Sequence, residues 1–354
     1  MARIPADPAE ITAGWLSDVM CADVASCHVE QIAIGVGLLG RLFRVTLQGR
    51  DLPPSVVVKL PTLDVRARTN LCENLNFYLR EVHFYQEIGL ANPLPPARPL
   101  HAAFDDSTHD FVLVLEDLGA LRNADQTIGC DATDAGTVMD ALARHQAYWW
   151  NNDRLASLPW LSTYNTPPFP TSTIANVQHS WPRFLEHFGD RMSPAMRHFG
   201  DRLPSLIPWY FAELARPPHT FLHGDLRLDQ LFFAMTSADA AVTALDWQLT
   251  AKGRGAYDVA YFLSQSLATD TRRSHEGQLL ERYAERLRDF GIGYPHEELQ
   301  RDYRLATAIC FVYPVIATGR IDIANERQLE LLRAMADRSV LAIEDNDALA
   351  LRPD

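Results

Sequence analysis

Hydrophobic residues in the first third of the chain alternate with polar ones over short stretches, which is typical of β-strands. Residues 8–20 and 66–88 instead place apolar side chains at helical spacing. Together these stretches predict a five-stranded antiparallel sheet with one main helix over roughly the first 115 residues. The strands are expected at residues 29–34, 40–47 and 56–60, followed by a strand pair that ends with residues 111–115.

The remainder of the chain is predicted to be mainly helical, with a short hairpin around residues 223–246 and a proline-rich, irregular stretch over residues 157–172. A chain of 354 residues is long enough for two lobes. We therefore expect an α+β protein with one lobe over residues 1–115 and another over residues 116–354. Helices are expected at residues 134–151, 174–190, 194–214, 256–268, 275–290, 296–317 and 324–347.

The charge and composition of the chain limit the classes of partner that it is expected to bind. The sequence has 32 Lys and Arg against 45 Asp and Glu, a formal net charge of -13. Nucleic acids and anionic membranes favour basic surfaces, so we expect neither as a partner. No run is apolar and long enough to span a bilayer. The five cysteines lack metal-ligand spacing and indicate free thiols in a reducing, cytoplasmic compartment, whereas no pattern indicates an oligomeric state.

Three glycines, Gly35, Gly37 and Gly40, form a GxGxxG pattern between two predicted strands. In a dinucleotide-binding fold this pattern opens a helix, whereas in a kinase-like fold it joins two strands. The strand-like residues 41–47 that follow favour the second arrangement, in which the glycine backbone lies against ATP phosphates. A plain hairpin turn is the alternative for this motif taken alone.

Lys59 ends a run of three valines, where a charge is costly unless it is used. In kinases such a strand lysine contacts the α- and β-phosphates and is oriented by a helix glutamate. Glu81 is the predicted partner on the next helix, and Glu73 is the fallback. The alternatives are an edge-strand lysine and a glutamate on a solvated helix face.

Residues 113–118 are predicted to link the two lobes. Backbone groups at Glu116 would bind the edge of adenine, and Leu118 or Leu115 would cover the ring. The prediction rests on position in the chain, because such a link requires no special side chains.

A second group of polar residues follows at short spacings around a buried run. Asp225, after His223, is predicted to be the base that orients the acceptor hydroxyl and takes its proton. Asp246 is predicted to bind Mg²⁺, and Gln230 to add a carbonyl oxygen, because Mg²⁺ prefers hard oxygen ligands. His223 is expected to shape the loop. An acidic surface hairpin is the alternative, although the neighbouring Phe232 indicates burial.

The acceptor is expected near Asp225, Arg227, Trp247 and residues 157–185. Asp258, in the first turn of the following helix, is predicted to hold the catalytic loop or to cap the helix. Aromatic residues of this lobe could bind an apolar or amine group, although most are expected in the core. They are Trp149, Trp150, Trp160, Tyr164, Trp181, Trp209 and Tyr210.

These motifs resemble the superfamily of aminoglycoside phosphotransferases and choline kinases, and most closely its ecdysteroid-kinase-like (CHK-kinase-like) branch. The resemblance implies a protein-kinase-like bilobal fold and an ATP- and Mg²⁺-dependent kinase that phosphorylates a hydroxyl of a small molecule. The matching motifs, in the family's order, are residues 35–40, 56–59, 80–85, 113–118, 142–149, 223–233 and 245–247.

Gln230 departs from the family's pattern, which usually has Asn at this position. The longer side chain would shift the second metal position, and the adjacent Asp229 could compensate. This departure keeps a second function open, a catalytically weak or silent nucleotide-binding pseudokinase that acts through a partner. The sequence leaves the acceptor open among apolar alcohols, hydroxy acids and amino alcohols, and it leaves ATP and GTP undistinguished.

Overall fold

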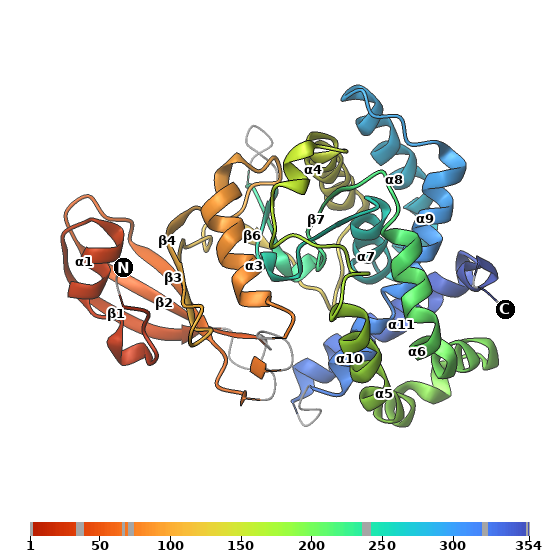
Figure 1. Cartoon of the computed structure of the whole chain (residues 1–354), viewed down its shortest axis with the longest axis horizontal. Coiled ribbons are helices and arrows are strands. Elements are labelled where there is room, and N and C mark those ends of the chain that lie inside the picture. The colour runs from red at the N-terminus through yellow and green to blue at the C-terminus, as the bar shows by residue number, and fades with distance from the viewer. Residues whose placement is uncertain are drawn as a thin grey trace. The chain divides into compact units, whose positions relative to one another are not determined.

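The computed structural model describes residues 3–32, 39–65, 68–69, 74–235, 242–320, 325–351 and 353. The chain divides into two compact units (Figure 1). The first comprises Met1–Arg122 and Thr243–Leu249, and the second comprises Asn123–Val242 and Thr250–Asp354.

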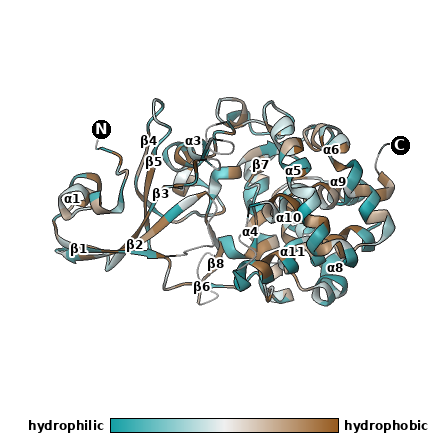
Figure 2. Ribbon diagram, turned by 90° about the horizontal axis from the view of Figure 1, so that it is seen from below, coloured by the Kyte–Doolittle hydropathy of each residue, from teal (hydrophilic) through white to brown (hydrophobic). Residues whose placement is uncertain are grey.

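The first unit is built on a five-stranded antiparallel sheet with the strand order β1-β2-β3-β5-β4, as predicted. Its β1 begins earlier than predicted because most residues at its start are exposed and show no apolar alternation. Brown hydrophobic and teal hydrophilic positions lie side by side along β2 in Figure 2. The strands are β1 (Val24–Ile32), β2 (Gly40–Gly49), β3 (Ser55–Pro61), β4 (Pro99–Phe104) and β5 (Phe111–Glu116).

Two helical segments pack on this sheet. A 3-10 turn, η1 (Pro8–Glu10), precedes α1 (Ala13–Met20), whose Leu16 and Val19 join the valines of the sheet in one core. The helix predicted over residues 66–88 is interrupted, because Asn76 has a left-handed φ of 57° and α3 begins after it. The helical segments here are α3 (Phe77–His83), the π-helix η3 (Phe84–Ile88) and η4 (Gly89–Ala91).

The second unit is mainly helical, as predicted. Among the described residues, no helix combines the length and apolar character that crossing a bilayer requires. Every residue of α7 is buried, whereas α8 is largely teal in Figure 2. The helices are α4 (Ala132–Trp149), α5 (Phe169–Phe188), α6 (Pro194–Leu214), α7 (Ala256–Ser266), α8 (Thr269–Asp289), α9 (His296–Ile309), α10 (Val312–Thr318) and α11 (Glu326–Asp345), with short turns η5 (Asp153–Ala156), η6 (Gly189–Arg191), η7 (Leu228–Gln230) and η9 (Ala348–Leu351).

One predicted helix, over residues 296–317, is two helices. Pro314 has no amide hydrogen to donate to the carbonyl of Cys310, so the helical ladder breaks between α9 and α10. The Tyr313 amide binds the Cys310 carbonyl instead, at 3.2 Å. This break leaves Tyr313 on a separate helix from α9.

Short strands carry the residues of the predicted hairpin. β7 and β10 pair antiparallel within the second unit. The chain passes between the two units within β6, within β9 and at the end of η8. These elements are β6 (Arg122–Asn123), β7 (Thr220–Leu222), β8 (Leu231–Phe233), β9 (Val242–Ala244), η8 (Trp247–Leu249) and β10 (Ala251–Gly253).

Gly200 of α6 lets Trp181 of α5 lie directly on its backbone, since a Cβ there would be 2.0 Å from the indole ring. We expect Gly200→Ala to lower the free energy of unfolding by about 1–3 kcal/mol through overpacking. Gly277 of α8 has nothing within 4 Å of a built Cβ, so Gly277→Ala should be neutral or stabilise by about 0.5–1 kcal/mol. Chemical denaturation of both variants checks the contrast, and equal effects would contradict it.

Candidate active site

Lys59 lies at the centre of a buried ion-pair cluster in the first unit. Its Nζ donates to Oε1 and Oε2 of Glu81 at 2.9 and 2.8 Å, and also to Oδ1 of Asp246. Lys59 is 7% exposed and Glu81 is 1% exposed. The structure therefore brings together three residues that the sequence predicted for the nucleotide and metal sites.

The charges in this cluster depend on each other. Burial by itself lowers the pKa of Lys59, but the charges of Asp246 and Glu81 and their hydrogen bonds outweigh it and raise this pKa above its usual value. Burial raises the pKa of Glu81, and Asp246 adds to this, while Lys59 opposes it. One ammonium thus holds two carboxylates that would otherwise repel each other.

Lysine is rare in this chain, which makes its presence at position 59 informative. The sequence has only two lysines, Lys59 and Lys252, among 32 basic residues. Arginine elsewhere supplies the surface charge, yet the buried strand position carries a compact ammonium that can bind several oxygens at once.

Asp246 is fixed by its neighbours in the first unit. It has a left-handed φ of 66°, a conformation that Asp tolerates better than most residues. Trp247, which follows it, stacks on Phe84 of the π-helix with ring centroids 4.1 Å apart and an interplanar angle of 8°. Trp247 is fully buried, and its ring anchors the chain beside Asp246; that the acceptor binds near Trp247 stays a prediction.

The glycine-rich pattern is described only at its last member. Gly35 and Gly37 lie outside the described residues, as does Glu73. Gly40 begins β2, and a Cβ there would come within 3.1 Å of Cε of Lys59. A glycine at this position therefore leaves room for the lysine side chain.

The segment predicted to bind adenine is held by its own contacts. The Glu116 carboxylate accepts a hydrogen bond from the Arg98 amide at 2.6 Å, and the Glu116 amide donates to the Arg98 carbonyl at 2.9 Å. Leu118 is half-buried. Asp117, which the sequence did not single out, accepts from Arg44 and Ser55 at 2.7 Å each and so ties β5 to β2 and β3.

In the second unit, a tight loop carries the predicted base. Gly224 has a φ of 85°, which favours glycine. The amides of His223 and Gly224 donate to Oδ2 and Oδ1 of the fully buried Asp258, each at 2.9 Å. Asp258 thus holds the loop that carries Asp225, the contact that the sequence indicated. Burial raises its pKa to about 6, although the two amides lower it.

Asp225 is bound through one of its two carboxylate oxygens. Oδ1 accepts from Nε of Arg227 at 2.9 Å and from the hydroxyl of Tyr261 at 2.7 Å. Within the part of the chain that the structure describes, Oδ2 takes no hydrogen bond. His223 accepts the Asp225 amide at its Nδ1, 3.2 Å away, and is fully buried. Its contacts are those of a residue that shapes the loop.

A family model described as the ecdysteroid kinase-like family matches residues 37–291, well over half of the chain. This chain belongs to that family. The match confirms the branch that the motifs had indicated. A comparison with curated protein sequences gives no significant match.

Solved structures with the same fold are small-molecule phosphotransferases by name. A protein described as an aminoglycoside phosphotransferase from Ralstonia eutropha JMP134 is 17% identical, with a TM-score of 0.58 over 99% of this chain and 100% of the other. Choline kinase LicA from Streptococcus pneumoniae is 14% identical, with a TM-score of 0.53 over 94% and 97% of the two chains. Plasmodium vivax ethanolamine kinase is 10% identical, with a TM-score of 0.53 over 98% and 90%. These likenesses confirm the predicted kinase-like fold.

Gln230, where the family usually has asparagine, lies at the end of η7. The Gln230 amide donates to the Arg227 carbonyl at 3.0 Å, and its side chain is half-buried. Gln230 belongs to the second unit and Asp246 to the first. Among the described residues, no three His, Cys, Asp or Glu side chains gather as a metal site. The oxygens of Asp246 and Gln230 are of the hard type that suits Mg²⁺.

Sequence reasoning missed two tyrosines beside Asp225, the predicted base. Tyr261 lies one helical turn after Asp258 on α7 and reaches Asp225, so its i+3 spacing is the signal that could have found it. Tyr313 stacks on Tyr261 with centroids 4.5 Å apart and donates to the Gly224 carbonyl at 3.2 Å. No sequence pattern around Asp225 or Asp258 indicates Tyr313, because this residue lies on α10, far away in the sequence.

His145 of α4 binds the strand β7, which leads into the loop that carries Asp225. Its Nε2–H donates to the Phe221 carbonyl at 3.0 Å, and the side chain is fully buried. Burial lowers its pKa to about 3, and the nearby His223 lowers it further, whereas the bond to Phe221 opposes this shift. The folded protein therefore keeps this ring neutral at pH values where the unfolded chain protonates it.

The neutral His145 predicts a specific acid sensitivity. Below the ordinary pKa of about 6.5, the unfolded chain takes up a proton at His145 that the folded chain refuses until about pH 3. Stability from this group is therefore lost as pH falls. Relative to His145→Gln, the wild type should lose about 1.4 kcal/mol of unfolding free energy per pH unit between pH 6 and 4. Urea unfolding at several pH values measures this, and a pH-independent difference would contradict it.

Proposed function

We propose that this protein is an ATP- and Mg²⁺-dependent phosphotransferase that phosphorylates a hydroxyl group of a small molecule. The observation that carries the proposal is the buried Lys59–Glu81 ion pair joined by Asp246. Such a pair is what a kinase-like site uses to bind nucleotide phosphates. Membership of the ecdysteroid kinase-like family supports the same function. The names of the fold neighbours, which include choline and ethanolamine kinases, agree with it.

The nucleotide is assigned to residues 1–115 and the link that follows them. Lys59 would bind the α- and β-phosphates, oriented by Glu81. The backbone of residues 35–40 would lie along the phosphates. Adenine would pair with backbone groups near Glu116 and lie against Leu118. Residues 116–354 would then provide catalysis and the acceptor site.

Asp246 and Gln230 are the residues that we propose to hold Mg²⁺. When bound, Mg²⁺ would neutralise charge on the β- and γ-phosphates. Asp246 has a partly exposed side chain, 24% accessible, which suits a carboxylate that must meet a ligand. Lys59 places its positive charge directly beside this carboxylate.

Asp225 is proposed as the base. With Oδ1 held by Arg227 and Tyr261, Oδ2 can accept the proton of the acceptor hydroxyl. The acceptor oxygen then forms its bond to the γ-phosphorus as the bond between that phosphorus and the bridging oxygen breaks, which releases ADP. Arg227 also places a positive charge beside the developing charge of this transfer.

The compartment is proposed to be the cytoplasm. Among the described cysteines, Cys21, Cys27, Cys130 and Cys310 are free thiols, and burial raises the pKa of Cys130 to about 12. Unreactive buried thiols of this kind are compatible with a reducing environment.

Asp225→Asn tests the assignment of the base. We expect acceptor-dependent ADP release to fall by at least about 10²-fold, because the amide cannot take the hydroxyl proton. ATP affinity should change by less than about twofold, since the nucleotide is assigned to other residues. The assay is a coupled ADP-release screen of alcohols, hydroxy acids and amino alcohols, in which we expect aminoglycosides not to be the best acceptors. Unchanged turnover in the variant would rule out Asp225 as the base.

Lys59→Arg tests the nucleotide site, with Lys252→Arg as the matched control at the only other lysine. The guanidinium is larger and needs a planar fork, so kcat/KM for ATP should fall by about 10²-fold in Lys59→Arg. Lys252, whose Nζ donates to the Leu155 carbonyl at 3.4 Å, should tolerate the exchange. Mg²⁺-dependent ATP binding without any acceptor-dependent turnover would instead favour the silent pseudokinase that Gln230 leaves open.

A further inference from the structure

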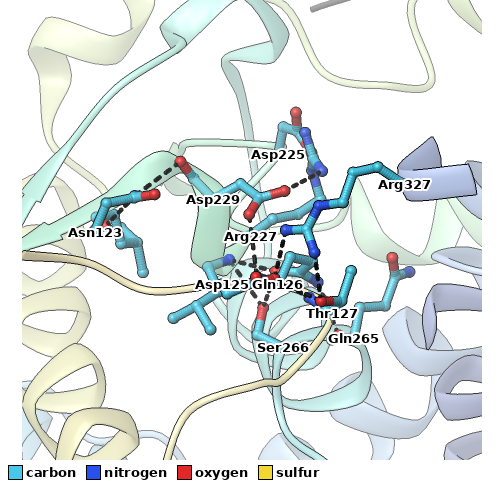
Figure 3. Close-up of polar contacts among 12 residues, drawn as sticks. Asn123, Asp125, Gln126, Thr127, Asp225, Arg227, Asp229, Gln265, Ser266 and Arg327 are labelled. Atoms are coloured by element: carbon cyan, nitrogen blue, oxygen red, sulfur yellow. Dashed lines mark hydrogen bonds and ion pairs between the residues drawn. The ribbon is translucent and has the colours of Figure 1, made fainter. Parts of the chain in front are cut away.

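Asn123 contacts the backbone on both sides of Gln230. Its side-chain nitrogen Nδ2 donates to the carbonyl of Asp229 at 3.3 Å and to the carbonyl of Leu231 at 3.0 Å (Figure 3). An amide nitrogen has two hydrogens, so it can serve both carbonyls at once. All four residues belong to the second unit. One side chain therefore holds the chain directly before and directly after the proposed magnesium ligand.

Gln126 holds the turn that leads to Gln230. Its Oε1 accepts from the Leu228 amide at 2.8 Å, and its own amide donates to Oδ1 of Asp229 at 3.1 Å (Figure 3). Leu228 and Asp229 are the first two residues of η7, which ends at Gln230. The turn is thus fixed from a part of the chain that lies about a hundred residues away in the sequence.

Gln126 is a firm support because it is fully buried and bound by two helices. Its Nε2 donates to the Gln265 carbonyl of α7 at 2.8 Å, and Nη1 of Arg338 from α11 donates to the Gln126 carbonyl at 2.7 Å. In addition, Nη2 of Arg327, at the start of α11, binds Asp125 at 2.6 Å (Figure 3). The segment of residues 123–127 therefore connects η7 to the helical core of the second unit.

The glutamine at position 230 gives this support a consequence for metal binding. Glutamine has one more rotatable bond than the asparagine that the family usually has here, so its oxygen can reach more positions and costs more entropy to fix. A fixed backbone removes part of that freedom. Replacing a residue that orients a metal ligand typically lowers metal affinity by about 10- to 100-fold.

We propose that Asn123 and Gln126 are positioning residues for Mg²⁺. They act by fixing the backbone on both sides of Gln230, which limits the positions that its side-chain oxygen can take. Neither residue would touch the metal or the substrate. The inference rests on the proposed function, in which Gln230 contributes a carbonyl oxygen to Mg²⁺.

Asn123→Ala is the first test. The measured quantity is the factor by which saturating Mg²⁺ tightens ATP binding, obtained by calorimetry with and without Mg²⁺ and without an acceptor. We expect this factor to fall by about tenfold, whereas ATP affinity without Mg²⁺ should stay within about twofold of the wild type. Asn123 is exposed, so the urea midpoint should change little. An unchanged factor would overturn the inference.

Gln126→Met tests the second support. Methionine has a similar length, and both lost partners keep another hydrogen bond. The Leu228 amide still donates to Oγ of Ser266 at 3.1 Å, and the Gln265 carbonyl still accepts from Nη1 of Arg338 at 3.0 Å. The variant should therefore unfold in one cooperative transition, at a lower urea midpoint, while the Mg²⁺ factor falls by about tenfold. A folded variant with the wild-type factor would exclude Gln126 from the positioning role.

A double-mutant cycle with Gln230→Ala separates positioning from a general change of the site. Alanine removes the side-chain oxygen and leaves the backbone carbonyls that Asn123 binds. Gln230→Ala alone should lower the Mg²⁺ factor at least as much as Asn123→Ala does. In the Gln230→Ala background, Asn123→Ala should change the factor by less than about twofold, since no side-chain oxygen is left to position. Losses that add in the two backgrounds would overturn the inference.

Asn152→Ala provides the control. Asn152 also donates through Nδ2 to a backbone carbonyl, that of Tyr148 at 3.1 Å, elsewhere in the second unit. This variant should keep the wild-type Mg²⁺ factor, and an equal loss in Asn152→Ala and Asn123→Ala would also overturn the inference. If ATP binding by the wild type does not respond to Mg²⁺, the proposed function itself fails. If Gln230→Ala lowers the factor and Asn123→Ala does not, only the positioning role fails.

Discussion

The burial of the Lys59 ammonium is the constraint around which the first unit is organised. An isolated charge in a protein interior costs several kcal/mol in lost hydration, so the sheet position is tenable only with carboxylates in place. Glu81 supplies one from α3, and Asp246 supplies the other from a segment that is far away in the sequence. The stacking of Trp247 on Phe84 fixes that distant segment in the same unit. The ion pair of Lys59 with Asp246 thus helps to hold residues 243–249 in the first unit.

In the second unit, the buried charge that must be stabilised is negative. Asp258 is stabilised by two backbone amides, a solution that also shapes the loop they belong to. Asp225, which lies in that loop, is stabilised by side chains instead, and only at one oxygen. A carboxylate with both oxygens bound is structural, whereas a carboxylate with one oxygen left over can do chemistry.

The features that could be recognised from the sequence share a local cause. Each of them involves residues that are close together in the sequence, so it could be found without knowing the fold. They are the alternation of apolar and polar residues in the strands, the lysine after three valines and the His-Gly-Asp motif. Asp258 and Tyr261 are also close together in the sequence, although only the first was recognised. The interruption at Asn76 and the π-helix that follows were missed, because periodicity does not report a left-handed residue or an added residue per turn. Gln126 could not have been predicted either, since it meets its partners about a hundred residues away along the chain.

The scarcity of lysine has a consequence for how this protein meets chemical reagents. Thirty of its 32 basic side chains are guanidiniums (32 less two lysines), which stay charged up to very alkaline pH and do not react with amine-directed acylating agents. Of the two side-chain amines, Lys59 is buried and ion-paired. Acylation of lysine side chains in the folded protein would therefore be confined to Lys252, so a dye attached through a lysine would mark one known position.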